Sequence, residues 1–402
     1  MTIVTILNST APDNGATKSW MPLLEGLNQR NVSIIAVLPD NKGVYQKLND
    51  IGCDTIVLNY RQSTYPYARN FKEICAFIFR LLYRMTLNFF ATIKLFNLLK
   101  NKNVDLIHSN VSVVSWGAKV AKKLNIPHVL HFREYFDTYY HQTQIPSNKT
   151  FFKCINSDKS YSICITKDIW RHFKLDANTN SKVIYDCVEV DSDFIKYNDI
   201  QLDFKDYFLF VGRGEKGKGL MELISAYAKC LKSVRHVRKL VVIGDMDADL
   251  NYKTRVYDRI KEEKIQDFVI FLGVRKHVEW FMTNARAVIV PSFFEGFGRV
   301  LPEAMLCKTI TIAFNSGGSK EQFDNGYNLW KQDIGLRYDN LDQLTHYLVQ
   351  LSDNELSMYN DMIEKAYTTV KSLYGRKNNV DNVFDFFNDI IKKNSVNSQL
   401  LQ

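Results

Sequence analysis

Residues 287–305 read Ala-Val-Ile-Val-Pro-Ser-Phe-Phe-Glu-Gly-Phe-Gly-Arg-Val-Leu-Pro-Glu-Ala-Met. The apolar run 287–290 predicts a buried strand, and the glycines after it predict a turn that leads into a helix near 299–307. A helix start presents free backbone N–H groups and the positive end of the helix dipole, so this turn suits a diphosphate. Glu295 in the turn and Glu303 in the helix are then placed to accept hydrogen bonds from sugar and ribose hydroxyls. The alternative is that both are ordinary solvated glutamates.

Short apolar runs alternate with helical patterns on both sides of this stretch, as in parallel sheets whose strands are buried on both faces. We expect strands at 2–7, 32–38, 55–58, 104–108, 127–131, 161–165 and 182–185, and again at 207–211, 239–243, 268–271, 287–290 and 309–313. The expected helices between them include 112–124, 218–232 and 251–264. The pattern predicts an α/β protein with two Rossmann-like units.

The length also favours two units, since 402 residues exceed what one hydrophobic core normally serves. We expect three parts, namely an N-terminal domain over 1–190, a C-terminal domain over 205–375, and a helix with a tail over 376–402. The expected link is the polar stretch Glu189–Lys205, which contains Asp191, Asp193, Asn198 and Asp199.

The composition bounds the class of protein. Apolar residues make up 46% of the chain, and Gly and Pro are not enriched, which excludes disorder and collagen. The net charge of +9 suits anionic small substrates, a membrane surface or nucleic acid, or serves only solubility. Seven cysteines without a C-x-x-C spacing predict reduced packing residues in a cytosolic protein. The N-terminus does not resemble a signal peptide, and no run of about 18 uncharged apolar residues predicts a spanning helix.

Residues 65–102 interleave aromatic and aliphatic side chains with cations. Glu73 is the only acidic residue there, and the basic ones are Arg69, Lys72, Arg80, Arg84, Lys94, Lys100 and Lys102. A helix of this composition can lie in a membrane interface, where its cations attract anionic headgroups. The alternative is two ordinary domain helices whose aromatic side chains form core. The expected location is cytoplasmic, with peripheral contact at the inner face of the plasma membrane under the first alternative.

A second glycine-rich loop lies upstream and carries two cations. It reads Phe-Val-Gly-Arg-Gly-Glu-Lys-Gly-Lys-Gly-Leu over 210–220, directly after a predicted strand. Arg213 and Lys218, beside accessible backbone N–H groups, can neutralise a diphosphate. Fixed cations lower the barrier when charge grows on a leaving diphosphate. The alternative is a basic surface turn. The phrase Asp-Met-Asp at 245–247 mimics a metal-binding motif, but we expect a loop there and no metal site.

Together these phrases resemble the GT4 type of glycosyltransferases (group 1), which have the GT-B fold. The stretch from Glu295 to Glu303 is similar to the family's E-x7-E motif, and the loop at 210–219 is similar to its VGR…KG loop. Further similar phrases are Val241-Val-Ile-Gly-Asp, Phe271-Leu-Gly-Val, and Asn315-Ser-Gly-Gly-Ser before Glu321. The resemblance covers roughly 205–335, whereas the N-terminal half matches loosely.

This resemblance implies two Rossmann-like domains that face each other across a cleft, with a C-terminal helix that crosses back to the N-terminal domain. His131, at a predicted strand end, is expected to hydrogen-bond to the donor sugar, and His108, at another, is a weaker candidate for the same site. Asn14-Gly15-Ala16 is similar to the family's Gly-Gly-Ala loop, with Asn14 in place of the first Gly. The implied catalytic residues are His131, Arg213, Lys218 and Glu295. The implied substrate-binding residues are Gly15, Val274, Gly296, Phe297, Gly298, Arg299, Val300, Glu303, Ser316 and Gly317. Ser316, Gly317, Gly318 and Glu321 are expected to follow a strand and precede a polar turn.

The implied activity is transfer of a sugar from a nucleotide-sugar, with a UDP-sugar as the first choice, and with retention of the anomeric configuration. The implied acceptor is a glycan or a lipid-linked glycan of bacterial surface polysaccharide synthesis. No metal cofactor and no nucleic-acid partner are expected. The resemblance implies a front-face attack without a carboxylate nucleophile, in which the protein contributes positioning and electrostatics.

Other functions stay open at this point. A nucleotide-sugar epimerase and a phosphorylase share the fold, but the phosphorylase needs a cofactor lysine context that the sequence lacks. An NAD-dependent dehydrogenase wants G-x-G-x-x-G after the first strand of a domain, and the closest phrase, at 212–217, is charged in a way that favours phosphate capture. A non-catalytic protein that binds membranes or RNA through its net positive charge is the alternative from another class.

Overall fold

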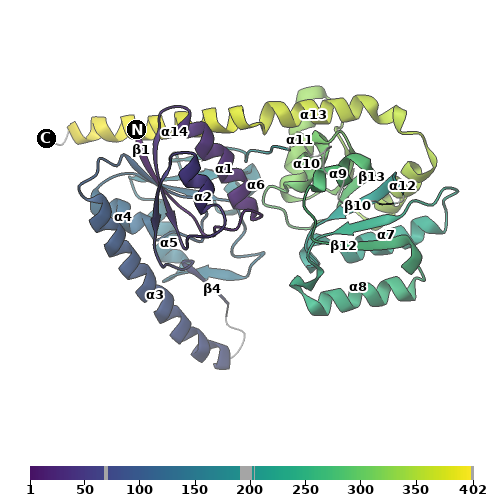
Figure 1. Cartoon of the computed structure of the whole chain (residues 1–402), viewed down its shortest axis with the longest axis horizontal. Helices are drawn as coiled ribbons and strands as arrows, with labels where there is room; N and C mark the ends of the chain where they lie inside the picture. The colour runs from purple at the N-terminus through teal and green to yellow at the C-terminus, as the bar shows by residue number, and fades with distance from the viewer. Residues whose placement is uncertain (68–70, 191–201, 203, 400–402) are drawn as a thin grey trace. The chain divides into compact units, whose positions relative to one another are not determined.

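The computed structural model of the chain describes residues 1–67, 71–190, 202 and 204–399, the last four of these by their backbone alone. The chain divides into two compact units (Figure 1). Unit 1 holds Met1–Cys187 and Arg376–Gln402, and unit 2 holds Val188–Gly375. Of the expected link, Asp191, Asp193, Asn198 and Asp199 lie outside the described residues. The chain therefore leaves unit 1 before residue 188 and returns to it through its last helix.

In the described part of unit 1, seven parallel strands form one sheet in the order β3-β2-β1-β5-β6-β8-β9. Their bounds are β1 Thr2–Ile6, β2 Ser33–Leu38, β3 Asp54–Val57, β5 Leu106–Ser109, β6 His128–Phe132, β8 Ser160–Cys164 and β9 Ser181–Val183. Most of these strands are apolar and buried on both faces, as a parallel sheet covered by helices requires. The register places Thr5 of β1 beside Ala36 of β2 and His108 of β5.

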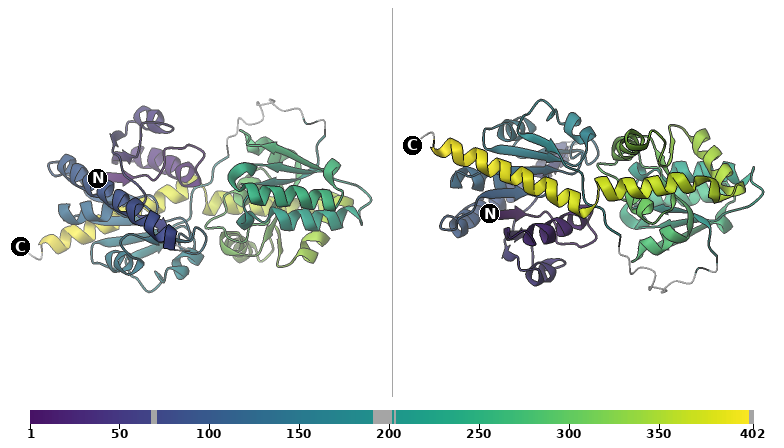
Figure 2. Two further views of the ribbon diagram at one scale, coloured as in Figure 1. Left: turned by 90° about the horizontal axis from the view of Figure 1, so that it is seen from below. Right: turned by 90° about the horizontal axis from the view of Figure 1, so that it is seen from above.

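The helices of unit 1 cover this sheet. They are α1 Gly15–Asn28, α2 Tyr45–Asp50, α3 Phe71–Leu99, α4 Gly117–Leu124, α5 Asn148–Ile155, α6 Lys167–His172 and α14 Arg376–Gln399. Helix α14, yellow in Figure 2, runs along unit 1 and shares one core with α1, to which Val383 and Phe387 contribute fully buried side chains. Gly26 of α1 permits this close approach, because a Cβ there would lie 2.4 Å from Cγ2 of Val380. The expected contact of the C-terminal helix with the N-terminal domain is thus confirmed.

In the described part of unit 2, six parallel strands form a second sheet in the order β12-β11-β10-β13-β14-β15. The strands are β10 Tyr207–Val211, β11 Leu240–Ile243, β12 Val269–Gly273, β13 Ala285–Val290, β14 Ile310–Phe314 and β15 Leu336–Tyr338. The helices are α7 Leu220–Leu231, α8 Leu250–Glu262, α9 Val278–Asn284, α10 Val300–Leu306, α11 Gly317–Trp330, α12 Leu341–Asp353 and α13 Asn360–Leu373. The core is built around Phe208, Leu223 and Val256, all fully buried. The prediction of two Rossmann-like α/β domains is confirmed.

Three local predictions differ from the structure. Ser316, Gly317, Gly318 and Glu321 do not precede a polar turn, because Gly317 begins the 14-residue helix α11. Two glycines at its start give this segment a low helix propensity, so the sequence does not indicate a helix there. Contacts with the loop after β13 stabilise the helix instead. The helix expected from residue 112 begins at Gly117. A small antiparallel ribbon of β4 (Thr64–Pro66) and β7 (Gln142–Gln144) was not predicted.

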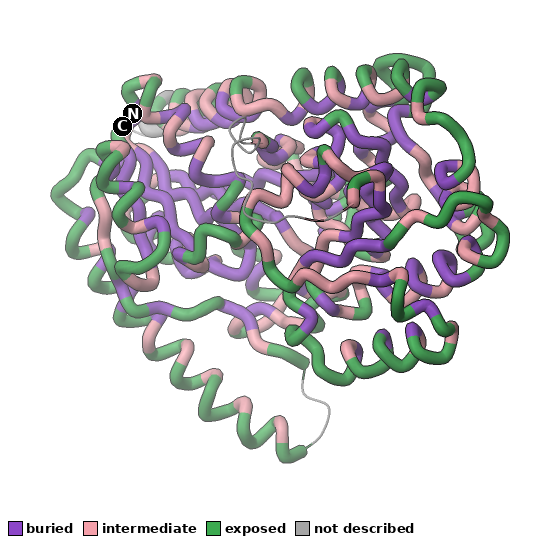
Figure 3. The backbone as a smooth tube through the Cα atoms, turned by 45° about the vertical axis from the view of Figure 1, so that its right-hand side comes forward, coloured by how far each residue is buried: buried purple, intermediate pink, exposed green. Residues whose placement is uncertain are grey.

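Segment 65–102 contains one long helix, α3, of 29 residues, and Arg69 lies outside the described residues. Of the two alternatives for this segment, the one in which its aromatic side chains form core does not hold, because Phe71, Phe79 and Phe90 are largely exposed. Only Asn88, Ala91, Thr92, Leu95 and Leu99 of α3 are buried, and Figure 3 shows the helix as a largely exposed rod. By length and composition alone, α3 is apolar enough to cross a membrane.

Candidate functional site

The site in unit 2 starts from the order of its strands. Strand β10 is followed along the chain by β11 on one side, whereas β13 is followed by β14 on the other, so the topology switches between β10 and β13. Open α/β sheets bind ligands at the carboxyl ends of the strands at such a point. The loop after β10 carries Arg213 and Lys218, and the loop after β13 carries Glu295. The predicted residues therefore come from the two strands that flank the switch point.

Hydrogen bonds tie these loops together around Glu295. The Nζ atom of Lys218 donates to Oε1 of Glu295 at 2.8 Å, and both side chains are largely buried. The backbone N–H of Phe293 donates to the carbonyl of Gly217 at 3.0 Å. The backbone N–H of Gly318 donates to the carbonyl of Glu295 at 2.9 Å. Glu295 thus joins the loop after β10 to the start of α11.

Arg213 lies in the same turn as Lys218 but has a different environment. Its guanidinium forms an ion pair with Glu215 at 3.1 Å, and its side chain is about half exposed, at 51%. The long, exposed side chain can reach a phosphate group, and its planar guanidinium can donate hydrogen bonds to two phosphate oxygens. Arg213 therefore lies in the same loop as Lys218, and its guanidinium is partly exposed to solvent.

Glycines bring backbone close to backbone at two positions of this site. Gly219 has φ +72°, and a Cβ there would lie 1.9 Å from the carbonyl oxygen of Pro291. A Cβ on Gly318 would lie 2.5 Å from the carbonyl oxygen of Phe297. Neither Gly219, which precedes α7, nor Ser316, which precedes α11, caps its helix with a side chain. Other groups bond to the first turns: the N–H of Met221 in α7 donates to the hydroxyl of Tyr252 at 2.9 Å, and the N–H of Gly318 in α11 donates to the carbonyl of Glu295 at 2.9 Å.

The second glutamate of the motif is also held by a cation. Arg299, which precedes α10, bonds through Nε to Oε1 of Glu303 at 3.1 Å, and both side chains are mostly buried. Phe297 packs its ring edge-on against Tyr374, which fixes the loop between the two glutamates. Val274, expected near the nucleotide base, follows β12 and is 68% exposed. Its exposed position lies at the carboxyl edge of the sheet, two strands away from the switch point.

The Asp-Met-Asp phrase forms a capped turn. Oδ1 of Asp245 accepts the N–H of Asp247 at 2.9 Å, and Asp247 forms an ion pair with Lys253 at 2.7 Å. Over the described residues, no group of three or more His, Cys, Asp or Glu side chains is arranged to hold a metal ion. All seven cysteines lie among the described residues, none of them forms a disulfide, and five are buried.

Unit 1 carries its predicted residues at its own switch point, between β1 and β5. After β1 the chain reaches Asn14, whose Oδ1 accepts the N–H of Ala16 at 3.0 Å and so caps α1. Asn is a preferred N-cap residue, and the cap explains how Asn14 can replace a glycine. Gly15 is the first residue of α1.

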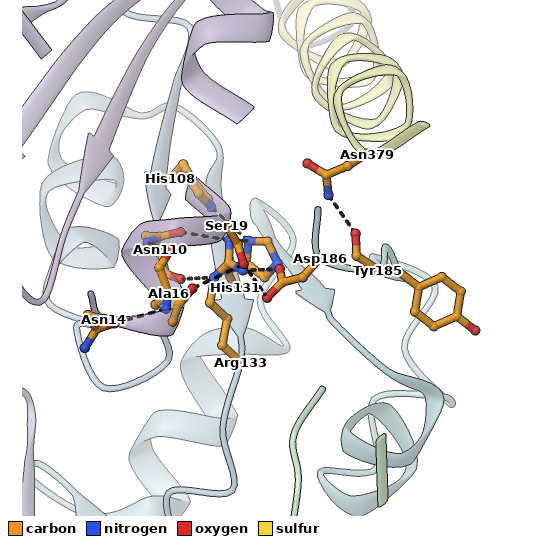
Figure 4. A network of polar contacts seen from close by, with 11 residues as sticks. Asn14, Ala16, Ser19, His108, Asn110, His131, Arg133, Tyr185, Asp186 and Asn379 are labelled. Carbon is orange, nitrogen blue, oxygen red and sulfur yellow. Dashed lines mark hydrogen bonds and ion pairs between the residues drawn. The ribbon is translucent and has the colours of Figure 1, made fainter. Parts of the chain in front are cut away.

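A chain of polar contacts runs from α1 to His131 through buried side chains (Figure 4). Trp20 Nε1 donates to Oγ1 of Thr5 at 2.9 Å, and Thr5 Oγ1 lies 3.1 Å from Nδ1 of His108. His108 Nε2 lies 3.3 Å from Nδ1 of His131, which also accepts from the guanidinium of Arg133 at 3.3 Å. The Nε2 atom of His131 has no hydrogen-bond partner among the described residues.

The donors in this chain assign the tautomers. Arginine only donates, so Nδ1 of His131 accepts and its proton sits on Nε2. His108 then donates from Nε2 to His131 and accepts from the Thr5 hydroxyl. Burial, with the nearby charge of Arg133, lowers the pKa of His131 well below its ordinary value and that of His108 to about 3. His131 is therefore a neutral donor whose free N–H can bind a hydroxyl.

Arg133 and Asp186 support this arrangement and were not predicted. Their side chains are only 4% and 6% exposed and form an ion pair. Arg133 also donates to the carbonyl of Asn110 at 2.9 Å, and Ser19 donates to Asp186 at 3.1 Å. The sequence offered one indication of Arg133, namely its position two residues after His131. Asp186 gave no such signal, because 53 residues separate it from Arg133.

The structure therefore brings some predicted residues together and keeps others apart. Lys218, Glu295, Gly296, Phe297, Gly298, Ser316 and Gly317 belong to one hydrogen-bonded group of loops, with Arg299, Val300 and Glu303 at the start of α10. Arg213 and Val274 lie on neighbouring loops of unit 2 with exposed side chains. Gly15, His108 and His131 lie in unit 1.

Comparisons with known proteins agree with this geometry. Residues 198–369 match the family model described as glycosyl transferases group 1. An uncharacterized glycosyltransferase of Methanocaldococcus jannaschii is 29% identical over 271 residues, which cover 64% of this chain and 68% of that protein. The N,N'-diacetylbacillosaminyl-diphospho-undecaprenol alpha-1,3-N-acetylgalactosaminyltransferase of Campylobacter jejuni is 23% identical over 339 residues, which cover 77% and 80%.

Among solved structures, HepE of Anabaena, in complex with UDP and glucose, superposes with a TM-score of 0.73 at 18% identity. The match covers 97% of this chain and all of HepE, so it concerns the fold of both units. The family model covers the described loops after β10, β13 and β14. Residues 198–369 therefore belong to the group 1 (GT4) glycosyltransferases, enzymes that transfer sugars from nucleotide-sugar donors, and the chain has the GT-B fold.

Proposed function

We propose that this chain transfers a sugar from a UDP-sugar to a lipid-linked glycan, as a step in the synthesis of a bacterial surface polysaccharide. The observation that carries the proposal is the Lys218–Glu295 pair at the switch point between β10 and β13. One cation and one hydroxyl acceptor lie there side by side, next to the start of α11, which Ser316 does not cap with its side chain. A nucleoside diphosphate sugar offers both a diphosphate and hydroxyls to such a place.

In the proposed reaction, Lys218 and Arg213 bind the diphosphate, whose negative charge grows as the glycosidic bond breaks. Lys218 then exchanges its contact with Glu295 for a phosphate oxygen. Glu295, released from its partner, accepts hydrogen bonds from hydroxyls of the donor sugar. Glu303 accepts from the ribose, and Arg299 keeps its carboxylate in place. No residue is assigned the role of a covalent nucleophile.

In unit 1, His131 donates its Nε2–H to a hydroxyl of the donor sugar and thereby orients the reacting carbon. It does not act as a general base, because Nδ1 is occupied by Arg133 and His108 and the low pKa disfavours proton uptake. The proton of the acceptor hydroxyl passes to the departing phosphate in a front-face attack. The protein then contributes positioning and a fixed field.

Uridine is proposed because HepE, which has the same fold, is described in complexes with UDP and with UDP-glucose. A lipid-linked acceptor is proposed because two similar Campylobacter jejuni enzymes are named for diphospho-undecaprenol substrates. The first of them is 27% identical over half of this chain. These names describe the donors and acceptors of those proteins, and binding and turnover measurements establish whether this chain uses the same ones.

The donor is tested by thermal shift with UDP, GDP, dTDP and their sugars. A ligand at a hundred times its Kd stabilises the folded state by about 2.7 kcal/mol. We expect UDP and a UDP-sugar to raise the Tm, and Glu303→Ala to reduce the rise. No rise with any of these nucleotides would contradict the proposed site.

The acceptor is tested by UDP release with a polyprenyl-diphosphate saccharide and with the same saccharide lacking the lipid. We expect turnover with the first to exceed turnover with the second. A UDP-sugar that changes its configuration without any acceptor would instead identify an epimerase. A His131→Gln variant is the matched probe in unit 1, since it should lower kcat and leave UDP binding unchanged.

A further inference from the structure

Helix α3 presents an apolar stripe that nothing in the described structure covers. Its residues recur at intervals of three and four along the helix and are all exposed, namely Phe71, Cys75, Ile78, Leu82, Met85, Phe89 and Ile93. We call this set the α3 stripe. Two of its phenylalanines, Phe71 and Phe89, are 78% and 60% exposed. At a rise of about 1.5 Å per residue, the α3 stripe is about 33 Å long.

A different face of the same helix, about 110° around the axis from the α3 stripe, holds α3 on unit 1. Asn88, Ala91 and Leu95 are buried there, and Arg84 donates to the carbonyl of Thr64 in β4. Both faces of α3 are therefore defined, one against the domain and one toward the surroundings. A soluble monomer rarely exposes an apolar surface of this extent without a partner.

The charges on α3 define the partner's chemistry. Lys72, Arg80 and Lys94 are exposed and, at 100° per residue, fall within a sector of about 80° that lies about 100–180° around the helix from the axis of the α3 stripe, on the side away from the buried residues; we call this sector the basic flank. Glu73 is the single acidic residue of the helix. An apolar stripe with a basic flank matches an anionic lipid surface, where acyl chains take the stripe and phosphates take the cations.

We propose that α3 lies in the plane of an anionic membrane surface and docks unit 1 onto it. A spanning orientation is disfavoured by the same residues. It would place Arg80 and Arg84 near the middle of the bilayer, where charged side chains are costly. It would also draw the β4–β7 ribbon, to which Arg84 is bonded, into the hydrocarbon, because that contact anchors the middle of α3 to the domain.

The surroundings of α3 fit an interfacial position. Tyr67 and Tyr140 are 47% and 45% exposed at the free half of the helix. Tyrosine is enriched at membrane interfaces, since its ring is apolar and its hydroxyl is polar. These two residues, with Phe77, Arg80 and His141, line an open cavity of about 730 Å³. In the proposed orientation this cavity lies at the level of the headgroups.

The inference goes beyond the proposed sugar transfer and stands without it. It is tested on the full chain by cosedimentation with vesicles of phosphatidylcholine plus phosphatidylglycerol, and with vesicles of phosphatidylcholine alone. The stripe variant combines Phe71→Gln, Leu82→Gln and Phe89→Gln. Gln is a good helix former and these positions are exposed, so α3 should remain intact. UDP-induced thermal shift measures the integrity of unit 2 separately.

The flank variant combines Lys72→Gln, Arg80→Gln and Lys94→Gln. Its matched control removes three exposed lysines elsewhere on the chain, through Lys149→Gln, Lys153→Gln and Lys261→Gln. We expect binding to the anionic vesicles to fall by about tenfold or more in the stripe and flank variants and by much less in the control. Equal losses in the flank variant and its control would overturn the assigned orientation, because net charge alone would then explain binding.

Depth is measured with a fluorophore on Cys75, a stripe residue that is exposed, after Cys154→Ser removes the other exposed thiol. We expect a blue shift on anionic vesicles and quenching by a lipid nitroxide placed just below the headgroups. The proposal is overturned if the wild-type protein does not cosediment with the anionic vesicles. So does self-association in solution that the stripe variant abolishes, because the α3 stripe would then be an interface between two copies of the chain.

Discussion

Three buried histidines should make unit 1 lose stability as the pH falls below 6.5. Burial lowers the pKa of His108 and of His128 to about 3, and that of His131 well below its ordinary value. In the unfolded chain each histidine takes up a proton near pH 6.5, whereas in the folded chain these histidines stay neutral. Unfolding therefore binds protons over this window, and the free energy of unfolding decreases with decreasing pH.

The size of the effect follows from the two histidines with a defined pKa. At about pH 5, each of His108 and His128 lowers the free energy of unfolding by about 2 kcal/mol relative to neutral pH. Their joint contribution to the slope is about 2.6 kcal/mol per pH unit at that pH. Glu134 acts in the opposite direction, because burial raises its pKa and the folded state takes up its proton first. The variant His108→Gln with His128→Gln retains Glu134 and His131, so its difference from the wild type isolates the two histidines.

The measurement is urea unfolding between about pH 7.5 and pH 5, followed by tryptophan fluorescence. In a Trp280→Phe, Trp330→Phe background, the remaining tryptophans Trp20, Trp116 and Trp170 all lie in unit 1 and report on it alone. Stability of the background protein should fall steeply with decreasing pH, and that of the double histidine variant should fall less. Parallel curves for the two proteins would refute the assignment of buried neutral histidines.

Three further outcomes concern unit 2. Replacing Arg213 and Lys218 together by Met should lower kcat by at least about 100-fold, as expected when fixed charges at a developing anion are lost, with an unchanged circular dichroism spectrum; near-normal turnover would contradict the phosphate assignment. Glu303→Ala should weaken UDP binding about tenfold in calorimetry, the value of one hydrogen bond to a charged group; an unchanged Kd would exclude the ribose contact. Gly318→Ala should lower the free energy of unfolding by about 1–3 kcal/mol and weaken UDP binding, because the new Cβ would lie 2.5 Å from the carbonyl oxygen of Phe297. A variant with unchanged stability and unchanged UDP affinity would exclude this close approach of Gly318 to Phe297.

Most of the fold was predictable because the strands of parallel sheets are short apolar runs that stand out from their surroundings. The runs at 2–7 and 207–211 were placed to within a residue or two of β1 and β10. Helix α11 was not predictable, because Gly317 and Gly318 oppose a helix and its start is stabilised by contacts with the distant loop after β13, to Phe293 and Glu295.

The contents of the site were predictable in part. Lys218 and Glu295 are 77 residues apart, and the resemblance to a family put them into one site before the 2.8 Å contact was known. The network around His131 was beyond the sequence. His108 and Arg133 bond to it directly, and Thr5 and Asp186 bond to those two residues in turn. A lone histidine at a strand end does not tell which of its nitrogens carries the proton.

The exposure of α3 was the question that composition could not answer. Phenylalanine and leucine at helical spacing describe a core helix and an interfacial helix equally well. What separates the two is which face contacts the domain. The buried residues of α3 are Asn88, Ala91, Thr92, Leu95 and Leu99, whereas large aromatic residues such as Phe71 and Phe79 are exposed. An amphipathic pattern therefore predicts a helix, but it does not tell whether the apolar residues of that helix face the protein core or a lipid surface.

The candidate residues of the two units share one principle of construction. In unit 2, Glu295 and Glu303 are each held by a cation, Lys218 and Arg299. In unit 1, Arg133 bonds to Nδ1 of His131. A side chain fixed in this way keeps its orientation, whereas a group that must attack carbon or remove a proton needs its lone pair free. We therefore expect both glutamates and the histidine to recognise the donor in the proposed reaction, in which the leaving diphosphate takes the acceptor's proton.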